Sequence, residues 1–434
     1  MVQEPSAVRP PPSRLRRTAF RLTLLLLTWL TCELLAMAGL WLTSDEVATA
    51  DPRETAAQIA SGAAASDGAT EVIHPYLGWV HNPQRALTEV VFGEDVPVNP
   101  LGFQDTNTSI HKRSADKFIL GITGGSVAWH MSIAGLQTLT QELQNHPALN
   151  GRTIEVVRLA TSGYKQPQQL MALNFIHVLG GEFDAIVNVD GYNEVALAIT
   201  ENAGMGTAIS YPRSWHARVI SSLDPASFAD AGRLLELRSG RQQMARNFLA
   251  SPFRWSAVRT LTWLIRDRKA RSELLDLGLE VSRVRKGSFV NHGPVNGFET
   301  KQTMQQAVID LWFRSSLQMN RLCGASNCLY LHVLQPNQYM EGSKPLSPEE
   351  LEDCYVEPGD PPGDAIRELY PLLVRTGDTL CDAGVSFSDQ TMLFADVTDT
   401  IYADHFCHYN KRGNIMLAQA VVTELRRLLD DSMR

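Results

Sequence analysis

The chain begins with one long apolar segment and continues with short apolar runs that alternate with helical patterns. Residues 22–42 read LTLLLLTWLTCELLAMAGLWL, in which Glu33 is the only charged residue. A helix rises about 1.5 Å per residue, so this segment covers about 31 Å, close to the roughly 30 Å hydrocarbon core of a bilayer. The pattern therefore predicts a helix over residues 22–42 that crosses a membrane once.

From residue 73 onward, apolar runs that end in turn residues recur between stretches with helical periodicity. The runs are residues 118–122, 153–159, 185–189, 329–334 and 385–387, and the helical stretches are residues 126–145, 167–179, 302–322 and 411–429. Strands separated by helices of this length pair in parallel through right-handed crossovers, with helices on both faces of the sheet. The pattern predicts an α/β fold whose ligand site lies at the carboxyl ends of the strands.

Three kinds of segment depart from this alternation. Residues 43–72 are rich in Ala, Ser and Asp without apolar periodicity, which predicts a flexible tether. Residues 74–79 and 98–103 alternate apolar residues with turn residues, as short strands do. Residues 201–300 are mostly helical in pattern, and we expect them to form an insertion in the domain of residues 73–434.

The charges beside the apolar segment predict its orientation. Acidic residues follow it, whereas five arginines precede it: Arg9, Arg14, Arg16, Arg17 and Arg21. The positive-inside rule then places residues 1–21 in the cytoplasm and the remainder outside it. A cleavable signal peptide stays an alternative, because Ala36-Met37-Ala38 and Ala48-Thr49-Ala50 resemble cleavage sites, although the apolar stretch is longer than usual for one.

Composition and charge exclude several classes of protein. With 44% hydrophobic and 20% charged residues, the chain is too apolar for wholesale disorder. Its net charge of −8 argues against a nucleic-acid binder, because no positive field would attract phosphates. Residues 238–271 are an exception, with nine Lys or Arg and one acid, Asp267. This stretch suits anionic lipid headgroups or an acidic glycan, or it is a solvated helix face paired with acids elsewhere.

Six cysteines are compatible with export without requiring it. Cys323 and Cys328 are close in sequence, just before an apolar run. They can close a short disulfide loop or remain two buried thiols.

Ser126 is the first candidate for chemistry. It lies directly after a predicted strand and at the start of a predicted helix, in the sequence LGITGGSVA. This location exposes the hydroxyl at the carboxyl end of the sheet and at the positive end of a helix dipole. It also leaves the Ser126 N–H free to bind a developing oxyanion. A serine that only caps a tight turn has the same local sequence.

Three later blocks supply partners for Ser126. Gly163 follows the second predicted strand, where the missing side chain lets a carbonyl oxygen approach the backbone N–H. Asn193 follows the third strand, and its amide is a further donor. His408 precedes the last helix in the sequence DHFCHYNKRG, where it can take the proton from Ser126 while Asp404 fixes its tautomer.

With these four blocks in this order, the sequence resembles the SGNH (GDSL-like) family of esterases and acyltransferases over about residues 115–200 and 300–430. It also looks like a membrane-anchored bacterial subgroup with an HPYLGW-type segment, here residues 74–79. The resemblance implies a three-layer α/β/α, flavodoxin-like parallel sheet. It also implies a set of roles: Ser126 as nucleophile, His408 as general base, Asp404 as the acid that orients it, and Ser126, Gly163 and Asn193 as the oxyanion hole.

The chain departs from the family pattern in two places. Gly125 stands where the name-giving motif has Asp, as in other members with Gly-Gly-Ser, and this leaves the serine chemistry intact. Asp404 and His408 are four residues apart, whereas the last block usually reads Asp-x-x-His. Choosing His405 would put Tyr402 at the acid position, so we assign His408, which adjoins the turn into the last helix.

Polar residues also follow the fourth predicted strand. We expect Gln335 and Asn337, in the sequence LQPNQY, to line an acyl or leaving-group pocket, although polar residues after a strand often form only a turn. We expect His130, His332 and His405 to be packing or surface histidines.

The sequence thus predicts a serine-dependent ester hydrolase, with no cofactor and no metal, anchored in the inner membrane with its catalytic domain on the periplasmic side. The expected substrate is an acylated, for instance O-acetylated, envelope glycan or lipid ester; a sugar hydroxyl in place of water would give an O-acyltransferase. A catalytically silent module that binds an envelope polymer is the alternative, supported by the irregular Asp/His spacing. A metal-dependent hydrolase has little support, because only Asp404, His405 and His408 cluster.

Overall fold

The computed structural model describes residues 14–42, 51–61, 71–83, 88–219, 225–284, 293–294 and 296–433. The chain forms two compact units, each with its own hydrophobic core. Met1–Asp67 and Ala229–Glu280 form the first unit, and Gly68–Phe228 and Val281–Arg434 form the second. About half of the expected insertion of residues 201–300, namely Ala229–Glu280, therefore groups with the amino-terminal segment and not with the sheet.

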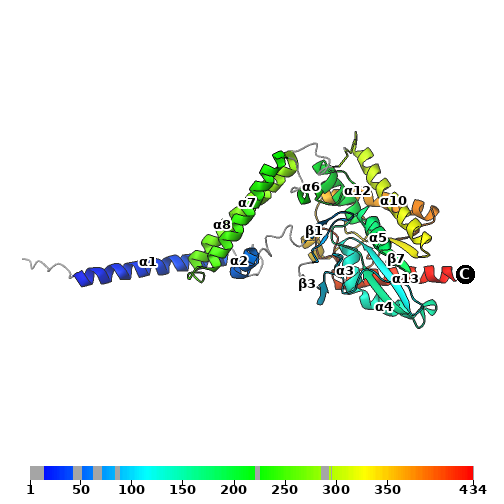
Figure 1. Cartoon of the computed structure of the whole chain (residues 1–434), viewed down its shortest axis with the longest axis horizontal. Coiled ribbons are helices and arrows are strands. Elements are labelled where there is room, and N and C mark those ends of the chain that lie inside the picture. Colours follow the sequence, from blue (N-terminus) through cyan, green and yellow to red (C-terminus); the bar gives the residue numbers. More distant parts are fainter. Residues whose placement is uncertain are drawn as a thin grey trace, which may run out of the picture. The chain divides into compact units, whose positions relative to one another are not determined.

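A five-stranded parallel sheet forms the centre of the second unit, as the apolar runs predicted (Figure 1). Its strand order is β6 (Thr153–Arg158), β5 (Lys117–Gly124), β7 (Ala185–Asp190), β8 (Leu329–Leu334) and β9 (Ser386–Asp389). Every neighbouring pair is parallel. The fold is therefore α/β, and a crossover connection joins each strand of the sheet to the next one in the sequence.

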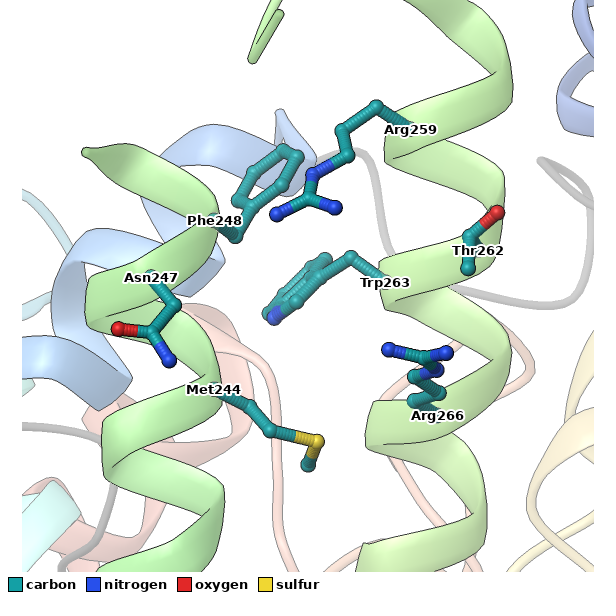
Figure 2. Close-up of a pocket in the computed structure, with 7 residues that line it drawn as sticks. All are labelled: Met244, Asn247, Phe248, Arg259, Thr262, Trp263 and Arg266. Atoms are coloured by element: carbon teal, nitrogen blue, oxygen red, sulfur yellow. The ribbon is translucent and has the colours of Figure 1, made fainter. Parts of the chain in front are cut away.

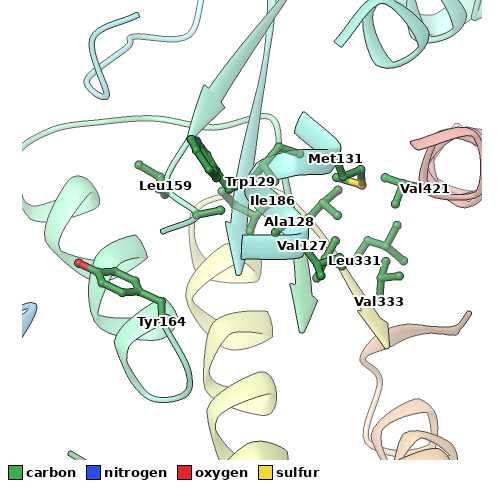
Figure 3. Packing of buried hydrophobic residues seen from close by; sticks show 14 of the residues in the cluster. Val127, Ala128, Trp129, Met131, Leu159, Tyr164, Ile186, Leu331, Val333 and Val421 are labelled. Atoms are coloured by element: carbon green, nitrogen blue, oxygen red, sulfur yellow. The ribbon is translucent and has the colours of Figure 1, made fainter. Parts of the chain in front are cut away.

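Helices cover both faces of this sheet. One group is α3 (Ser126–Ala134), α4 (Leu136–Gln144) and α13 (Lys411–Ser432), and the other is α5 (Gln168–Val178), α10 (Lys301–Ala325) and α12 (Pro361–Asp382). The side chains of β8 show that the two groups lie on opposite faces, because successive side chains of a strand point to opposite faces of the sheet. Leu331 and Val333 pack toward Val421 of α13 (Figure 3), whereas His332 bonds Ser316 of α10.

The remaining elements of the second unit are short. They are η1 (Pro147–Leu149), η2 (Asn193–Asn202), η3 (Ala203–Met205), α6 (Trp215–Arg218) and α11 (Pro348–Asp353), with the antiparallel pairs β1 (Glu71–His74) with β2 (Gly78–His81) and β3 (Thr88–Val91) with β4 (Glu94–Pro97). The first pair is anchored by Trp79, which is 1% exposed and whose carbonyl accepts a 2.5 Å hydrogen bond from Tyr164.

A buried ion pair ties the segment after β4 to the sheet. Asp105 and Arg158 are 1% and 5% exposed, and their side chains approach to 2.9 Å. Asp105 also accepts from the Arg158 N–H at 2.8 Å, and the Arg158 guanidinium continues to Ser132 of α3. Since each member satisfies the other, removal of either one leaves an unpaired buried charge.

The first unit contains four helices among its described residues: α1 (Arg14–Leu42), α2 (Pro52–Ser61), α7 (Pro225–Leu249, which begins in the second unit) and α8 (Ala257–Val284, which ends in the second unit). Within α1, residues Phe20–Leu40 are long and apolar enough to cross a membrane, and only 6% of this stretch is buried. The structure thus has a helix where the sequence predicts a membrane span.

The expectation of a flexible tether over residues 43–72 does not hold for α2. Ala56 and Ile59 lie three residues apart on one helix face and are 0% and 1% exposed. They pack against Phe248 of α7 and Trp263 of α8 in the core of the first unit. The Ala-rich composition had no visible periodicity because two small apolar contacts are enough to dock so short a helix.

Glu33, the acid inside the predicted span, has partners. Its carboxylate accepts hydrogen bonds from the Ser256 hydroxyl and, at 2.7 Å, from the Ala257 N–H at the start of α8. A carboxylate is favourable at this end of a helix because the first-turn N–H groups have no partner inside the helix. Glu33 therefore fixes the start of α8 beside α1.

The cysteines of the described residues are free thiols, including Cys323 and Cys328. Cys323 and Cys328 are therefore two buried thiols in the structure and not a disulfide.

We predict that Asp105→Asn destabilises the second unit by about 3 kcal/mol, because Arg158 then stays buried without a counter-charge. Urea unfolding of the full chain in detergent, followed by tryptophan fluorescence, measures the effect. Asp95→Asn is the matched control, since Asp95 is an exposed acid of β4. Equal unfolding midpoints for the two variants would contradict the prediction.

Candidate active site

Ser126 lies where the first buried strand of the sheet turns into a helix. β5 ends at Gly124 and α3 begins at Ser126, whose side chain is at the carboxyl end of the sheet. Gly124 has a φ of +141°, and a Cβ there would lie 2.1 Å from the Val189 carbonyl oxygen of β7. Only glycine fits this turn, and Ser126 is consequently held at a fixed point beside β7.

The structure brings His408 and Asp404 to Ser126. His408 Nε2 lies 2.7 Å from Ser126 Oγ, and His408 Nδ1 is hydrogen-bonded to the Asp404 carboxylate. Ser126 follows the first sheet strand in the chain, and the other two residues lie in the loop before α13. This is the arrangement in which a histidine takes a proton from a serine while an acid holds its tautomer.

The four-residue spacing of Asp404 and His408 suits this geometry. The loop between them turns so that the N–H groups of Phe406, Cys407 and His408 all donate to Asp404 Oδ1, at 2.9, 3.2 and 3.3 Å. Asp404 Oδ2 remains for His408. Burial by itself raises the pKa of Asp404, but the hydrogen bond and charge of the His408 side chain, with the Phe406 and His408 amides, lower that pKa to about 2. Asp404 is therefore ionised at neutral pH.

Asn193 and the loop that contains Gly163 meet beside Ser126. Asn193 Nδ2 donates to the Tyr164 carbonyl at 2.8 Å. A Cβ on Gly125 would lie 2.3 Å from the same Nδ2 and 3.3 Å from the Tyr164 carbonyl, so Gly125 is enclosed between them. The absence of a side chain at Gly125 is thus required for the close approach of Asn193.

Gly163 lies under a charged side chain. It has a φ of +83°, and a Cβ on it would lie 2.6 Å from Arg213 Cδ and 3.0 Å from Arg213 Nη1. Arg213 is paired with Glu201 at 2.6 Å. Among the described residues, none accepts a hydrogen bond from the Gly163 N–H. The Ser126 N–H belongs to the first turn of α3, where amides have no partner inside the helix.

Gln335 and Asn337 are buried after β8. They are 4% and 0% exposed. Asn337 donates to the Phe406 carbonyl at 3.2 Å, and Gln335 N donates to the Asp190 carbonyl at 3.0 Å. Asn337 thus connects the segment after β8 to the loop of Asp404 and His408, and the Gln335 backbone connects it to β7. A role of the two side chains in an acyl or leaving-group pocket stays a prediction.

The segment after β8 also supports this loop through residues that the sequence did not single out. Gln338 donates to the Asp404 carbonyl at 3.0 Å, and the Tyr339 hydroxyl donates to the His405 carbonyl at 2.6 Å. From the other side, the Tyr409 hydroxyl donates to the Pro336 carbonyl at 2.6 Å. No sequence signal marks these contacts, because they join segments about 70 residues apart.

Two buried acids hold the turn that contains Asn193, and the sequence DGYNE contained a signal for them. Asp190 accepts from the Trp312 indole and from His332, both at 2.8 Å. Glu194 accepts from the Gly191 N–H at 2.8 Å and from the Gln166 N–H at 3.2 Å, which joins the Asn193 turn to the Gly163 loop. Burial, with the charge of Asp190, raises the pKa of Glu194. His332 is a packing residue, as expected.

His130 is closer to the site than a packing role suggests. Its ring centroid lies 5.2 Å from that of His408, and Phe92 covers its other side at 5.5 Å. Burial, with the charge of His408, lowers the pKa of His130 to about 4. It is therefore a neutral wall beside His408 at neutral pH.

This arrangement can activate a hydroxyl and stabilise a negative charge next to it. Ser126 supplies the hydroxyl, His408 the base, and the amides of Ser126, Gly163 and Asn193 the donors. Within the described ranges, no group of three His, Cys, Asp or Glu side chains is arranged to hold a metal ion.

A scan of the chain against models of protein families found no match, and a search of curated proteins found none either.

We predict that Asp404→Asn removes a pH-dependent part of the stability. A pKa lowered from 3.8 to about 2 means that ionised Asp404 stabilises the fold above about pH 4, and this contribution is lost as the pH falls through about 2. Between about pH 5 and pH 2 the wild-type chain should lose up to about 2 kcal/mol more than the variant. Unfolding free energies measured over this range test it, with Asp95→Asn as a control that keeps the wild-type slope. Equal slopes for wild type and Asp404→Asn would refute it.

Proposed function

We propose that the chain is a serine-dependent ester hydrolase that works through an acyl-enzyme on Ser126. The observation that carries this proposal is the chain of hydrogen bonds from Asp404 through His408 to Ser126, with 2.7 Å between His408 Nε2 and Ser126 Oγ. The four sequence blocks that resemble the SGNH family point to the same chemistry. We also propose the flavodoxin-like fold of that family, which the strand order β6-β5-β7-β8-β9 supports.

In the first step, Ser126 Oγ attacks the ester carbonyl and His408 Nε2 takes its proton. The oxyanion is bound by the N–H groups of Ser126 and Gly163 and by Asn193 Nδ2. Collapse of this intermediate breaks the ester bond, and His408 returns the proton to the leaving alcohol. Water, deprotonated by His408, then attacks the acyl-serine and releases the carboxylic acid. Ionised Asp404 stabilises the imidazolium in both steps.

The location of the domain suggests the class of substrate. The Arg-rich residues 1–21 before the apolar segment 22–42 favour the cytoplasm, so the second unit would lie on the periplasmic side of an inner membrane. An acylated envelope glycan or lipid, for instance an O-acetylated one, is the ester available there. If a sugar hydroxyl replaces water in the second step, the same residues perform O-acyl transfer.

We predict that a fluorophosphonate labels the full chain once, on Ser126, and that Ser126→Ala abolishes both the label and the hydrolysis of p-nitrophenyl acetate. The reason is that only a hydroxyl paired with a base is nucleophilic enough to react. Intact mass and peptide mapping measure the label. Ser114→Ala is the matched control, since Ser114 is an exposed serine in the loop before β5.

The outcomes separate the candidate functions. Full labelling with slow acetate hydrolysis that a sugar acceptor accelerates identifies a transferase. No adduct and no turnover in a folded chain would refute the hydrolase and favour a module that only binds an envelope polymer.

We predict that Asn193→Ala lowers kcat by roughly 10²–10³-fold and leaves KM almost unchanged, because its amide acts mainly on the charge of the transition state. Steady-state kinetics with p-nitrophenyl acetate measure both constants. Asn145→Ala, at the exposed end of α4, is the control. A variant with wild-type kcat and an unchanged circular dichroism spectrum would show that Asn193 is not an oxyanion donor.

A further inference from the structure

A small cavity in the first unit lies between α7 and α8. It has a volume of about 140 Å³ and is lined by Met244, Asn247 and Phe248 of α7 and by Arg259, Thr262, Trp263 and Arg266 of α8 (Figure 2). Sites for drug-sized ligands are larger, at roughly 300–1,000 Å³, so this cavity takes a small group. None of its lining residues is acidic, and two are arginines.

Neither arginine of the cavity is paired with an acid of the described residues. Within the described part of the chain, neither the Arg259 nor the Arg266 guanidinium forms an ion pair, and both side chains are exposed. The one acid of this basic stretch, Asp267, is paired with Arg241 at 2.6 Å and is therefore not available to them. Arg259 and Arg266 are seven residues apart, which places them on one face of α8, two turns from each other. They are two cationic side chains on the part of α8 that lines the cavity.

The aromatic floor of the cavity is rigid. Phe248 and Trp263 stack with ring centroids 5.0 Å apart, and Figure 2 shows the Arg259 side chain directed toward these rings. Both aromatic residues belong to the core of the first unit, which also contains Ala56 and Ile59 of α2. The cavity is thus built on packed side chains, and its shape does not depend on a ligand.

Contacts with α1 give the depth of this cavity relative to the candidate membrane span. Glu33 accepts from the Ala257 N–H at the start of α8, and a Cβ on Gly39 would lie 3.3 Å from Leu261, so the two helices run in the same direction. The span ends at Leu40, about 10 Å beyond Glu33 at 1.5 Å per residue. Arg259 and Arg266 lie within about 5 Å and 15 Å of the start of α8, so they bracket the end of the span.

The connection between α7 and α8 lies about 10 Å deeper than the end of the span. Phe253 and Trp255 are 70% and 67% exposed there, close to the level of Glu33. On α8, Ile265 is 60% exposed next to Arg266. By this arithmetic Phe253 and Trp255 lie at the depth of the acyl chains, whereas Arg259 and Arg266 lie near the end of the span, where long cationic side chains reach the phosphates.

We propose that the cavity between α7 and α8 binds the phosphate of an anionic phospholipid in the leaflet at the Leu40 end of the span. Arg259 and Arg266 would donate to the phosphate oxygens, and Phe253, Trp255 and Ile265 would contact the acyl region. A zwitterionic choline headgroup fits less well, because its ammonium would meet two unpaired guanidinium groups. The proposal rests on α1 crossing a bilayer and is independent of the chemistry at Ser126.

Native mass spectrometry of the full chain, released from detergent with dioctanoyl phosphatidylglycerol or dioctanoyl phosphatidylcholine, tests this proposal. The wild-type chain should retain the glycerol lipid at concentrations where the choline lipid does not bind. R259Q/R266Q should weaken binding of the glycerol lipid about tenfold or more, since it removes two charge-assisted contacts. R268Q/R271Q is the matched control: it removes the same charge from exposed positions of α8 that do not line the cavity, and it should bind as the wild type does.

Three results would overturn the proposal. The first is equal binding of both lipids by the wild type. The second is an equal loss of binding in the two double variants, which would mean that only the net charge matters. The third is displacement of the lipid by inorganic phosphate at the same concentration, which would identify a free anion as the ligand. Circular dichroism confirms that each variant keeps its helices.

Discussion

The hydrogen bond between Ser126 and His408 depends on the arrangement of the whole second unit. It joins two residues that are 282 positions apart, one at the end of the first sheet strand in the chain and one in its last loop. A distance of 2.7 Å across such a separation requires that both backbones be fixed independently. The parallel sheet provides this, because β5 and β7 end side by side, with Gly124 opposite Val189. The turns after these two strands therefore meet at one edge.

Buried polar groups then hold the loops that no strand fixes. Asp190 and Glu194 accept hydrogen bonds from four different segments, and Glu350 accepts from the N–H groups of Ile401 and Tyr402 while paired with Lys344 at 2.7 Å. Buried donors and acceptors without partners cost free energy, so such groups favour a single arrangement of their loops. The position of His408 thus depends on contacts among buried polar groups as well as on its bonds to Ser126 and Asp404.

The first unit is stabilised in a different way. Its helices are held by a few aromatic and small side chains, and its arginines outnumber the acids that could pair with them. In water such a surface gains little from its unpaired charges, whereas at a bilayer surface each of them has phosphates nearby. Glu33 is the opposite case, an acid in an apolar helix. Such an acid is unfavourable in lipid unless it is hydrogen-bonded, and the start of α8 supplies the donors.

Much of the second unit was determined by the sequence alone. The period of the apolar positions and the turn residues were sufficient to predict the strands of the sheet and the long helices that cover it. They also predicted that Ser126, Gly163 and Asn193 follow successive strands, because these are local properties. The apolar segment of α1 was predictable for the same reason. What only the tertiary structure decided depends on contacts between distant segments. These include the approach of Asp404 to His408 despite their spacing, the burial of Gln335 and Asn337 under the loop, the docking of α2, and the grouping of α7 and α8 with α1. A linear sequence records which residues can pair, but burial and long-range hydrogen bonds, which select one pairing among many, exist only once the chain has folded.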